Sequence, residues 1–172
     1  MDNSHLEISK TQHYYEIACQ ANSQAQEYAK KRIGRLPAGT NEIEELLSYS
    51  KVVYNQSTIA VVFSAMTLES FINEYSIKSL PKNIFKNHLD KLSLLSKFII
   101  TPKLNGGSEM NTDCQEYQDL NWLIKLRNDL VHFKFKSYDV QMLTKDIINK
   151  NYIWEEHSER AVNCINCYNY ID

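Results

Sequence analysis

Helix-breaking residues are scarce in this chain and fall into three short groups. Its four glycines and three prolines are confined to residues 34–39, Pro81 and residues 102–107. The long segments between these groups contain neither residue, which is typical of a helical protein with a few defined turns. We therefore expect six helices, over residues 9–33, 41–79, 81–97, 112–136, 139–149 and 154–170.

Signals for helix starts agree with this division. A small polar residue stands three positions before an acid or amide, the spacing of a capping box, in three pairs: Ser9 with Gln12, Asn41 with Glu44, and Thr112 with Gln115. Pro81 fits the first turn of a helix, where its missing N–H costs nothing. Strand signals are weak, because runs such as 58-TIAVVF-63 lie within a helical period. The sequence predicts an all-α fold, an up-and-down bundle of four main helices with short additional helices.

The size and charge of the chain limit its functional class. Its 172 residues suit a single domain, 1–172, and the net charge of −2 gives no overall reason to expect nucleic-acid or membrane binding. The first 30 residues mix charged and apolar side chains, unlike a signal peptide. No run approaches the roughly 18 apolar residues of a membrane span. We expect a cytoplasmic protein with no membrane partner.

The four cysteines, at positions 19, 114, 164 and 167, lack the dense spacing of a disulfide-rich domain. Cys164 and Cys167 form a lone C-x-x-C pair in a segment of helical character, and residues three apart simply share one face of a helix. We expect reduced thiols, no metal site and no cofactor. A thiol-dependent metal protein that uses this pair is one alternative interpretation.

An arginine interrupts the apolar stripe of segment 112–136. At 100° per residue, the apolar side chains from Leu120 to Phe133 cover one broad face, and Arg127 falls near its middle. Asn128 and His132, four residues apart, lie at one edge of that face. Because Arg127 and His132 are about 140° apart around an ideal helix, they cannot meet without a kink, a long arginine reach or a second subunit.

Segment 41–79 carries an acid that matches this arginine. Its expected core stripe consists of large apolar residues, namely Val52, Ile59, Val62, Phe63 and Met66. Continuing the stripe brings Glu69 and then Asn73 onto the same face. A charge in the core is costly unless paired, so we expect Glu69 to pair with Arg127. Such a pair is equally consistent with a structural role that fixes helix register, so the pattern alone does not establish chemistry.

Three segments resemble a known family. The run 127-RNDLVH-132 resembles the R-x(4–6)-H signature of HEPN domains, in which a polar residue, very often Asn, follows the arginine. The segment 60-AVVFSAMTLESFINEYS-76 is similar to a helix of many bacterial HEPN proteins, and 91-KLSLLSKFIITPKLNGG-107 looks like their connector. The resemblance covers roughly residues 50–136. We expect a HEPN-like core of about 41–136, with N- and C-terminal helical additions.

This resemblance implies a helical bundle that forms a homodimer, with two signature helices lining one composite cleft. In active members it implies metal-independent endoribonuclease activity of the kind found in toxin–antitoxin, abortive-infection and antiviral phage-defence systems. RNA would be the substrate, and an antitoxin or regulatory protein a further partner. Other members of the family have lost catalysis, so the alternative is an inactive RNA- or protein-binding module.

The chemistry of the signature residues suits this activity. Histidine exchanges protons near neutral pH, so His132 would assist attack by the ribose 2′-hydroxyl or protonate the leaving oxygen. The planar, permanently charged guanidinium of Arg127 would stabilise charge on the phosphate. Asn128 would orient the imidazole or contact substrate, and Glu69 and Asn73 would support the arginine from the neighbouring helix.

Lysines supply a local basic character that the net charge conceals. Between residues 78 and 103 there are six lysines, at 78, 82, 86, 91, 97 and 103, and one acid, Asp90. Three more lie around the signature, Lys125, Lys134 and Lys136, and these are the expected RNA-binding residues. A solvated lysine-rich helix face is the alternative interpretation of the first group.

Overall fold

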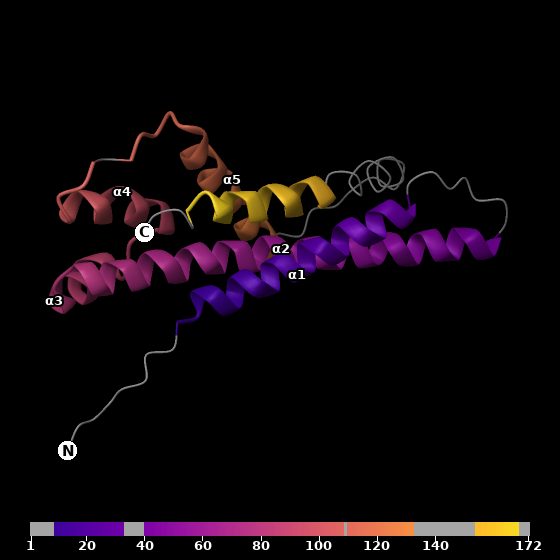
Figure 1. Ribbon diagram of the computed structural model, residues 1–172, viewed down its shortest axis with the longest axis horizontal. Helices are drawn as coiled ribbons and strands as arrows, with labels where there is room; N and C mark the ends of the chain where they lie inside the picture. The colour runs from indigo at the N-terminus through magenta and orange to yellow at the C-terminus, as the bar shows by residue number, and fades with distance from the viewer. Residues whose placement is uncertain (1–8, 33–39, 109, 133–153, 169–172) are drawn as a thin grey trace, which may run out of the picture.

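The computed structural model describes residues 9–32, 40–108, 110–132 and 154–168 (Figure 1). Within these ranges the regular structure is entirely helical, which confirms the all-α prediction. The predicted helix over residues 139–149 lies outside the described residues. None of the helices in the described ranges combines the length and apolar composition that a membrane-spanning helix needs.

Two long helices form the base of the molecule. Helix α1 (Thr11–Arg32) runs along α2 (Thr40–Ser79), and the pairings of Tyr14 with Phe63 and of Tyr28 with Tyr49 show that the two are antiparallel (Figure 1). Both helices bury small side chains: Ala18, Ala21, Ala25 and Ala29 on α1, and Ser57, Ala60, Ser64 and Ala65 on α2. Small residues allow helix axes to approach closely, because interaxial distance depends on the side chains at the contact.

The buried face of α2 differs from the predicted stripe. Ile59 is 36% exposed, and Val52, Val62, Phe63 and Met66 are only partly buried. The fully buried positions include Val53, Val61, Leu68 and Ile72, together with the alanines and serines. The prediction was wrong because the buried face of α2 lies beside the predicted stripe and includes small residues, which a stripe drawn through large apolar side chains does not reveal.

The predicted helix over residues 81–97 is also wrong, because the chain turns between two separate elements. Pro81 precedes a short α3 (Lys82–Ile84), which continues into a π-helical turn, η1 (Phe85–Leu89). Helix α4 (Leu94–Leu104) then begins after Ser93, whose hydroxyl accepts a hydrogen bond from the Ser96 backbone N–H at 3.1 Å. This N-cap satisfies one backbone donor of the first turn.

Helix α5 (Gln115–Val131) and a helix over residues 154–166 complete the fold. The latter, drawn in yellow in Figure 1, is called the C-terminal helix below. It packs between α1 and α5: Ser158 donates to Asn22 on α1, and Arg160 donates to Asp119 on α5. Ala161, Cys164 and Ile165 lie in the same hydrophobic core as Leu68, Leu120 and Leu123. Helix α1, through Ala18, and the C-terminal helix therefore both contribute to the hydrophobic core.

The predicted capping boxes do not form at the starts of α1 and α5. The hydroxyl of Ser9 donates to the Glu74 carboxylate on α2 at 2.9 Å, so α1 is fastened by a remote residue. Helix α5 follows Cys114, which makes no side-chain cap hydrogen bond. Asn41 lies inside α2, which starts at Thr40. At the start of α1, a tertiary contact that no local spacing reveals replaces the predicted capping box.

Candidate functional site

The predicted ion pair between α5 and α2 is present. Arg127 Nη2 lies 3.0 Å from Glu69 Oε2, and Arg127 Nη1 donates to Asn128 Oδ1 at 3.1 Å. The Arg127 side chain is 25% exposed and that of Glu69 is 44% exposed. The pair is thus half-buried, not in the core as predicted, and such pairs contribute only about 0–1 kcal/mol to stability.

The depth of Arg127 follows from its place along α5. Leu120 and Leu123 are fully buried, whereas Leu126 and Leu130 are partly exposed and Val131 is 52% exposed. Helix α5 therefore leaves the core towards its C-terminal end, and Arg127, one turn after Leu123, lies where the packing opens. Periodicity predicted the correct face, but it does not report how deep each turn lies.

His132 lies at the C-terminal end of α5, separate from this pair. His132 is the C-cap of α5, and its backbone N–H donates to the Asn128 carbonyl at 2.9 Å. The residue is exposed. Within the described ranges, the imidazole has no hydrogen-bond partner. Asn128 uses its side-chain oxygen to bind Arg127. The chain therefore brings Arg127, Asn128 and Glu69 together, while His132 stands apart from them on the same helix.

Asn73 serves a different group from the one predicted. Its side-chain oxygen accepts a hydrogen bond from Lys97 Nζ at 2.8 Å, and Lys97 is only 4% exposed. The Lys97 ammonium also lies 5.8 Å from the centre of the Phe85 ring, a cation–π contact. Asn73 thus hydrogen-bonds a buried lysine. Because Lys97 is buried, it does not belong to the exposed basic surface predicted for residues 78–103.

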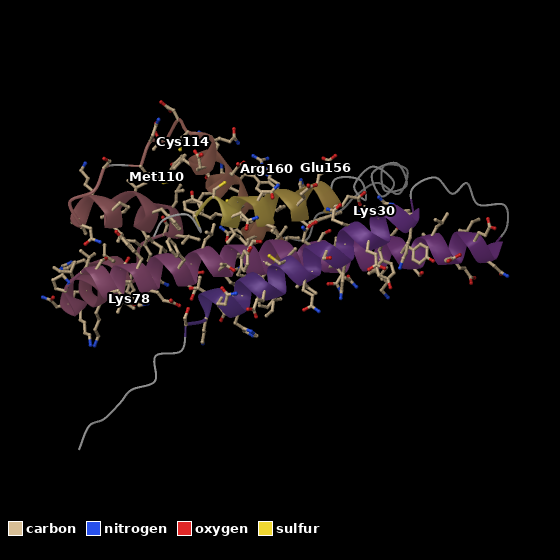
Figure 2. All side chains as sticks on the ribbon, in the orientation of Figure 1. Lys30, Lys78, Met110, Cys114, Glu156 and Arg160 are labelled. Atoms are coloured by element: carbon tan, nitrogen blue, oxygen red, sulfur yellow. The ribbon has the colours of Figure 1, made fainter. Side chains whose placement is uncertain are left out.

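The remaining lysines of that segment are exposed, at positions 78, 82, 86, 91 and 103. Figure 2 shows Lys78 at the end of α2 near α3, away from the C-terminal helix. Lys125 is exposed on α5. Lys134 and Lys136 lie outside the described residues. The exposed lysines are thus divided between the segment of residues 78–103 and α5. Among these described lysines, Lys125 lies on the same helix as Arg127.

The two cysteines of the C-x-x-C pair differ in accessibility. Cys164 is buried and Cys167 is exposed, and burial raises the pKa of the Cys164 thiol to about 12. A thiol held protonated is a poor metal ligand and a poor nucleophile. No three His, Cys, Asp or Glu side chains gather as a potential metal site in the described part of the chain.

A groove on the outer side of α5 was not predicted. It has a volume of about 390 Å³ and lies between α5 and the C-terminal helix, with Trp122 and Arg160 in its lining. Arg160 donates to Asp119 Oδ1 from Nε at 2.9 Å and from Nη2 at 2.6 Å, and its Cζ lies 4.3 Å from the centre of the Trp122 ring. Figure 2 labels Arg160 on the C-terminal helix. All of its lining residues lie on α5 except Arg160, whose position depends on the packing of the C-terminal helix against α5.

Comparison with known proteins gives no match: no family model, curated protein or solved structure is significantly similar to this chain.

Proposed function

We propose that this chain is a metal-independent endoribonuclease of the HEPN type, acting as a toxin or phage-defence effector under the control of an antitoxin or regulatory partner. The observation that carries the proposal is the arrangement at the end of α5. Arg127 is held in a fixed direction by Glu69 and Asn128, while the His132 imidazole is exposed one turn beyond Asn128. These are a cation and a proton-transfer group, the two components that RNA cleavage needs without a metal.

The guanidinium keeps donors for a substrate. Arginine has five N–H donors, and the bonds to Glu69 and Asn128 use two of them. The remaining donors can bind phosphate oxygens and stabilise the charge that builds up in the transition state. Because the pair with Glu69 is half-exposed, phosphate can approach without first breaking a buried salt bridge.

The cleavage step transfers a proton at each end of the reacting phosphate. The ribose 2′-oxygen attacks phosphorus and loses its proton, and the bond from phosphorus to the 5′-oxygen breaks. The departing 5′-oxygen takes up a proton, so the products are a 2′,3′-cyclic phosphate and a 5′-hydroxyl. His132 would act as the base or as the acid, since an imidazole side chain can accept or donate a proton.

A homodimer would combine the separated residues. In one chain, Arg127 binds Glu69 on α2 and His132 is the C-cap of α5, and residues five apart lie about 140° apart around an ideal helix. If two α5 helices face each other, His132 of one protomer can act beside Arg127 of its partner. Val131, an apolar residue that is 52% exposed next to His132, is consistent with an interface there.

The test is cleavage of a structured RNA in excess EDTA by the purified protein. We expect wild type to produce 2′,3′-cyclic phosphate ends, and His132→Ala and Arg127→Ala each to reduce the rate at least about a hundredfold. His13→Ala, at an exposed histidine on α1, is the matched control and should retain full activity. Absence of cleavage by wild type, equal cleavage by the variants, or a requirement for divalent metal would overturn the proposal. RNA binding without cleavage would instead support the inactive binding module.

A further inference from the structure

The outer groove of α5 has the composition of a nucleobase site. Arg160 lies over one face of the Trp122 ring at 4.3 Å, and the His157 ring lies 5.5 Å from it, so a base would stack on the face away from Arg160. Leu126 adds an apolar wall. Two amides, Gln118 and Asn121, also line it. Aromatic faces with nearby arginine bind unpaired bases by stacking, in a way that tolerates any sequence. Amide side chains then discriminate among bases by hydrogen bonding to their edges.

The charges of the groove favour a base over a phosphate. Asp119 neutralises Arg160 through two hydrogen bonds to one carboxylate oxygen. Lys125 and Asp129, both in the lining, carry opposite charges. The formal charges therefore cancel, so binding must depend on stacking and hydrogen bonds more than on phosphate contacts.

The amides are arranged to read an adenine. Gln118 Nε2 donates to the Thr112 carbonyl at 3.0 Å, which fixes the amide and leaves its oxygen as an acceptor. Asn121 has no hydrogen-bond partner among the residues that the structure describes, so both halves of its amide are available. One amide group can pair with the N6 amino group and N7 of adenine at the same time.

The groove leads along α5 to His132. The lining residues of α5 recur at positions 118, 121, 122, 125, 126 and 129, which is one face of a helix. Three residues beyond 129 is His132, and Trp122 lies about 15 Å before it along the axis. A base on Trp122 would therefore belong to a nucleotide farther along the same strand, not to one directly beside the scissile phosphate.

We propose that this groove binds an unpaired adenine of single-stranded RNA, stacked on Trp122 and read by Asn121, and so positions the strand relative to His132. The choice of RNA as the ligand rests on the proposed function. Lys125, at the rim, has no carboxylate partner within the described ranges and would contact the adjoining phosphate.

Tryptophan fluorescence tests the groove directly, because the chain has only two tryptophans. The Trp154→Phe protein retains Trp122 as its single reporter. The probe is an adenine-containing oligoribonucleotide with 2′-O-methyl groups, which cannot undergo attack by a 2′-hydroxyl. We expect saturable quenching by this probe and by AMP, weaker quenching by UMP, and none by ribose 5-phosphate. The Trp122→Phe protein, which reports only Trp154, should show little change.

Variants at the rim and the amide make the test specific. Asn121→Ala should weaken oligonucleotide binding at least about fivefold, the effect of one lost hydrogen bond. Lys125→Gln should weaken binding of the oligonucleotide at least about tenfold, since a charged hydrogen bond is lost. Lys51→Gln, at an exposed lysine on α2, is the matched control and should bind as wild type does.

The outcomes separate this inference from the proposed function. Quenching by AMP in a protein that fails to cut unmodified RNA would support base binding in the groove and overturn the proposed nuclease activity. Suppose that Asn121→Ala and Lys125→Gln cleave RNA at the wild-type rate and that Trp122 does not respond to the oligonucleotide. This result would overturn base binding in the groove and leave the proposed nuclease activity intact. Equal quenching by AMP and ribose 5-phosphate would show an anion site and overturn base recognition. A change in Trp122 emission with protein concentration alone would show that a second copy covers the groove, which also overturns it.

Discussion

Arg127 is held by two neighbours of different kinds, a carboxylate on α2 and the amide of the next residue on its own helix. Because both partners are fixed on helices, the guanidinium has a defined direction although it is partly exposed. The half-exposed ion pair adds little to the free energy of unfolding. Its larger effect would be on the position of the Arg127 guanidinium relative to the substrate. A variant can therefore separate the effect on the cleavage rate from the effect on stability.

Glu69→Gln should therefore affect cleavage more than stability. It keeps the size of the side chain and removes the charge that orients Arg127. We expect the free energy of unfolding to change by less than about 1 kcal/mol. The single-turnover cleavage rate should fall at least about tenfold, because a misplaced catalytic group loses much of its effect. Glu159→Gln, at an exposed position of the C-terminal helix, is the control. An unchanged rate, or a rate loss explained entirely by unfolding, would contradict this role.

Glu74 makes the start of α1 sensitive to pH. Partial burial opposes its ionisation, but hydrogen bonds from Ser9, Thr11 and Ser70 outweigh this effect and lower the pKa of Glu74 below its ordinary value. A carboxyl with a lowered folded-state pKa stabilises the fold above its unfolded-state pKa, and this contribution is lost as pH falls through the folded-state pKa.

Glu74→Gln should consequently be destabilising at neutral pH by about 1–2 kcal/mol, the cost of losing charged hydrogen bonds. The difference from wild type should shrink as the pH falls, since the wild-type carboxyl becomes protonated too. Urea denaturation of both proteins between about pH 7 and pH 3 measures this difference. A difference that is constant across the series, or that grows at low pH, would exclude the proposed sign.

Among the elements, the C-terminal helix connects α1 with α5. It bonds to α1 through Asn22 and Arg32 and to α5 through Asp119, and it contributes Ile165 to the core. The buried ion pair between Arg32 and Glu155 lies at its start, with both side chains about one tenth exposed. Without this helix, α1 and α5 would expose the apolar surfaces that it covers.

Ile165→Ala should destabilise the protein by about 2–5 kcal/mol, because it leaves a cavity at a position that is 1% exposed. Glu159→Ala, exposed on the same helix, should change stability by no more than about 0.5 kcal/mol. The midpoints of urea denaturation give both values. If Ile165→Ala were as mild as the control, the C-terminal helix would not be part of the core.

Helix positions follow from local sequence better than helix ends or depths do. Breaker spacing and periodicity predicted α1, α2, α5 and the C-terminal helix, and charge compensation predicted the contact of Glu69 with Arg127. The contact of the start of α1 with Glu74 and the start of α4 after Ser93 depend on contacts and turns that the pattern did not reveal. The groove of Trp122 and Arg160 could not be predicted, because its two sides come together only when the C-terminal helix packs against α5.

For the whole molecule, the central question is how Arg127 and His132 come to act on one phosphate. Residues five apart lie about 140° apart around an ideal helix, and the exposed Val131 beside His132 offers an apolar contact for a second chain. We therefore expect a C2 homodimer in which each composite site takes one residue from each protomer.

Dimerisation should depend on the end of α5. Wild type should sediment as a dimer at micromolar concentration, and Val131→Glu should shift it to a monomer, because a charge would be buried in the interface. Ile77→Glu, at another exposed apolar residue near α3, should leave the dimer intact. A monomeric wild type, or a Val131→Glu protein that remains dimeric and active, would contradict an interface at this position.

The most direct test of the composite site is to mix the His132→Ala and Arg127→Ala proteins in EDTA and measure RNA cleavage. Each protein alone should be inactive. In an exchanged equimolar mixture, half of the dimers are mixed and each has one intact site, so we expect about a quarter of the wild-type activity. If the two residues acted within one chain, no mixed dimer would contain an intact site. A mixture that stays as inactive as its components after subunit exchange would contradict the composite site.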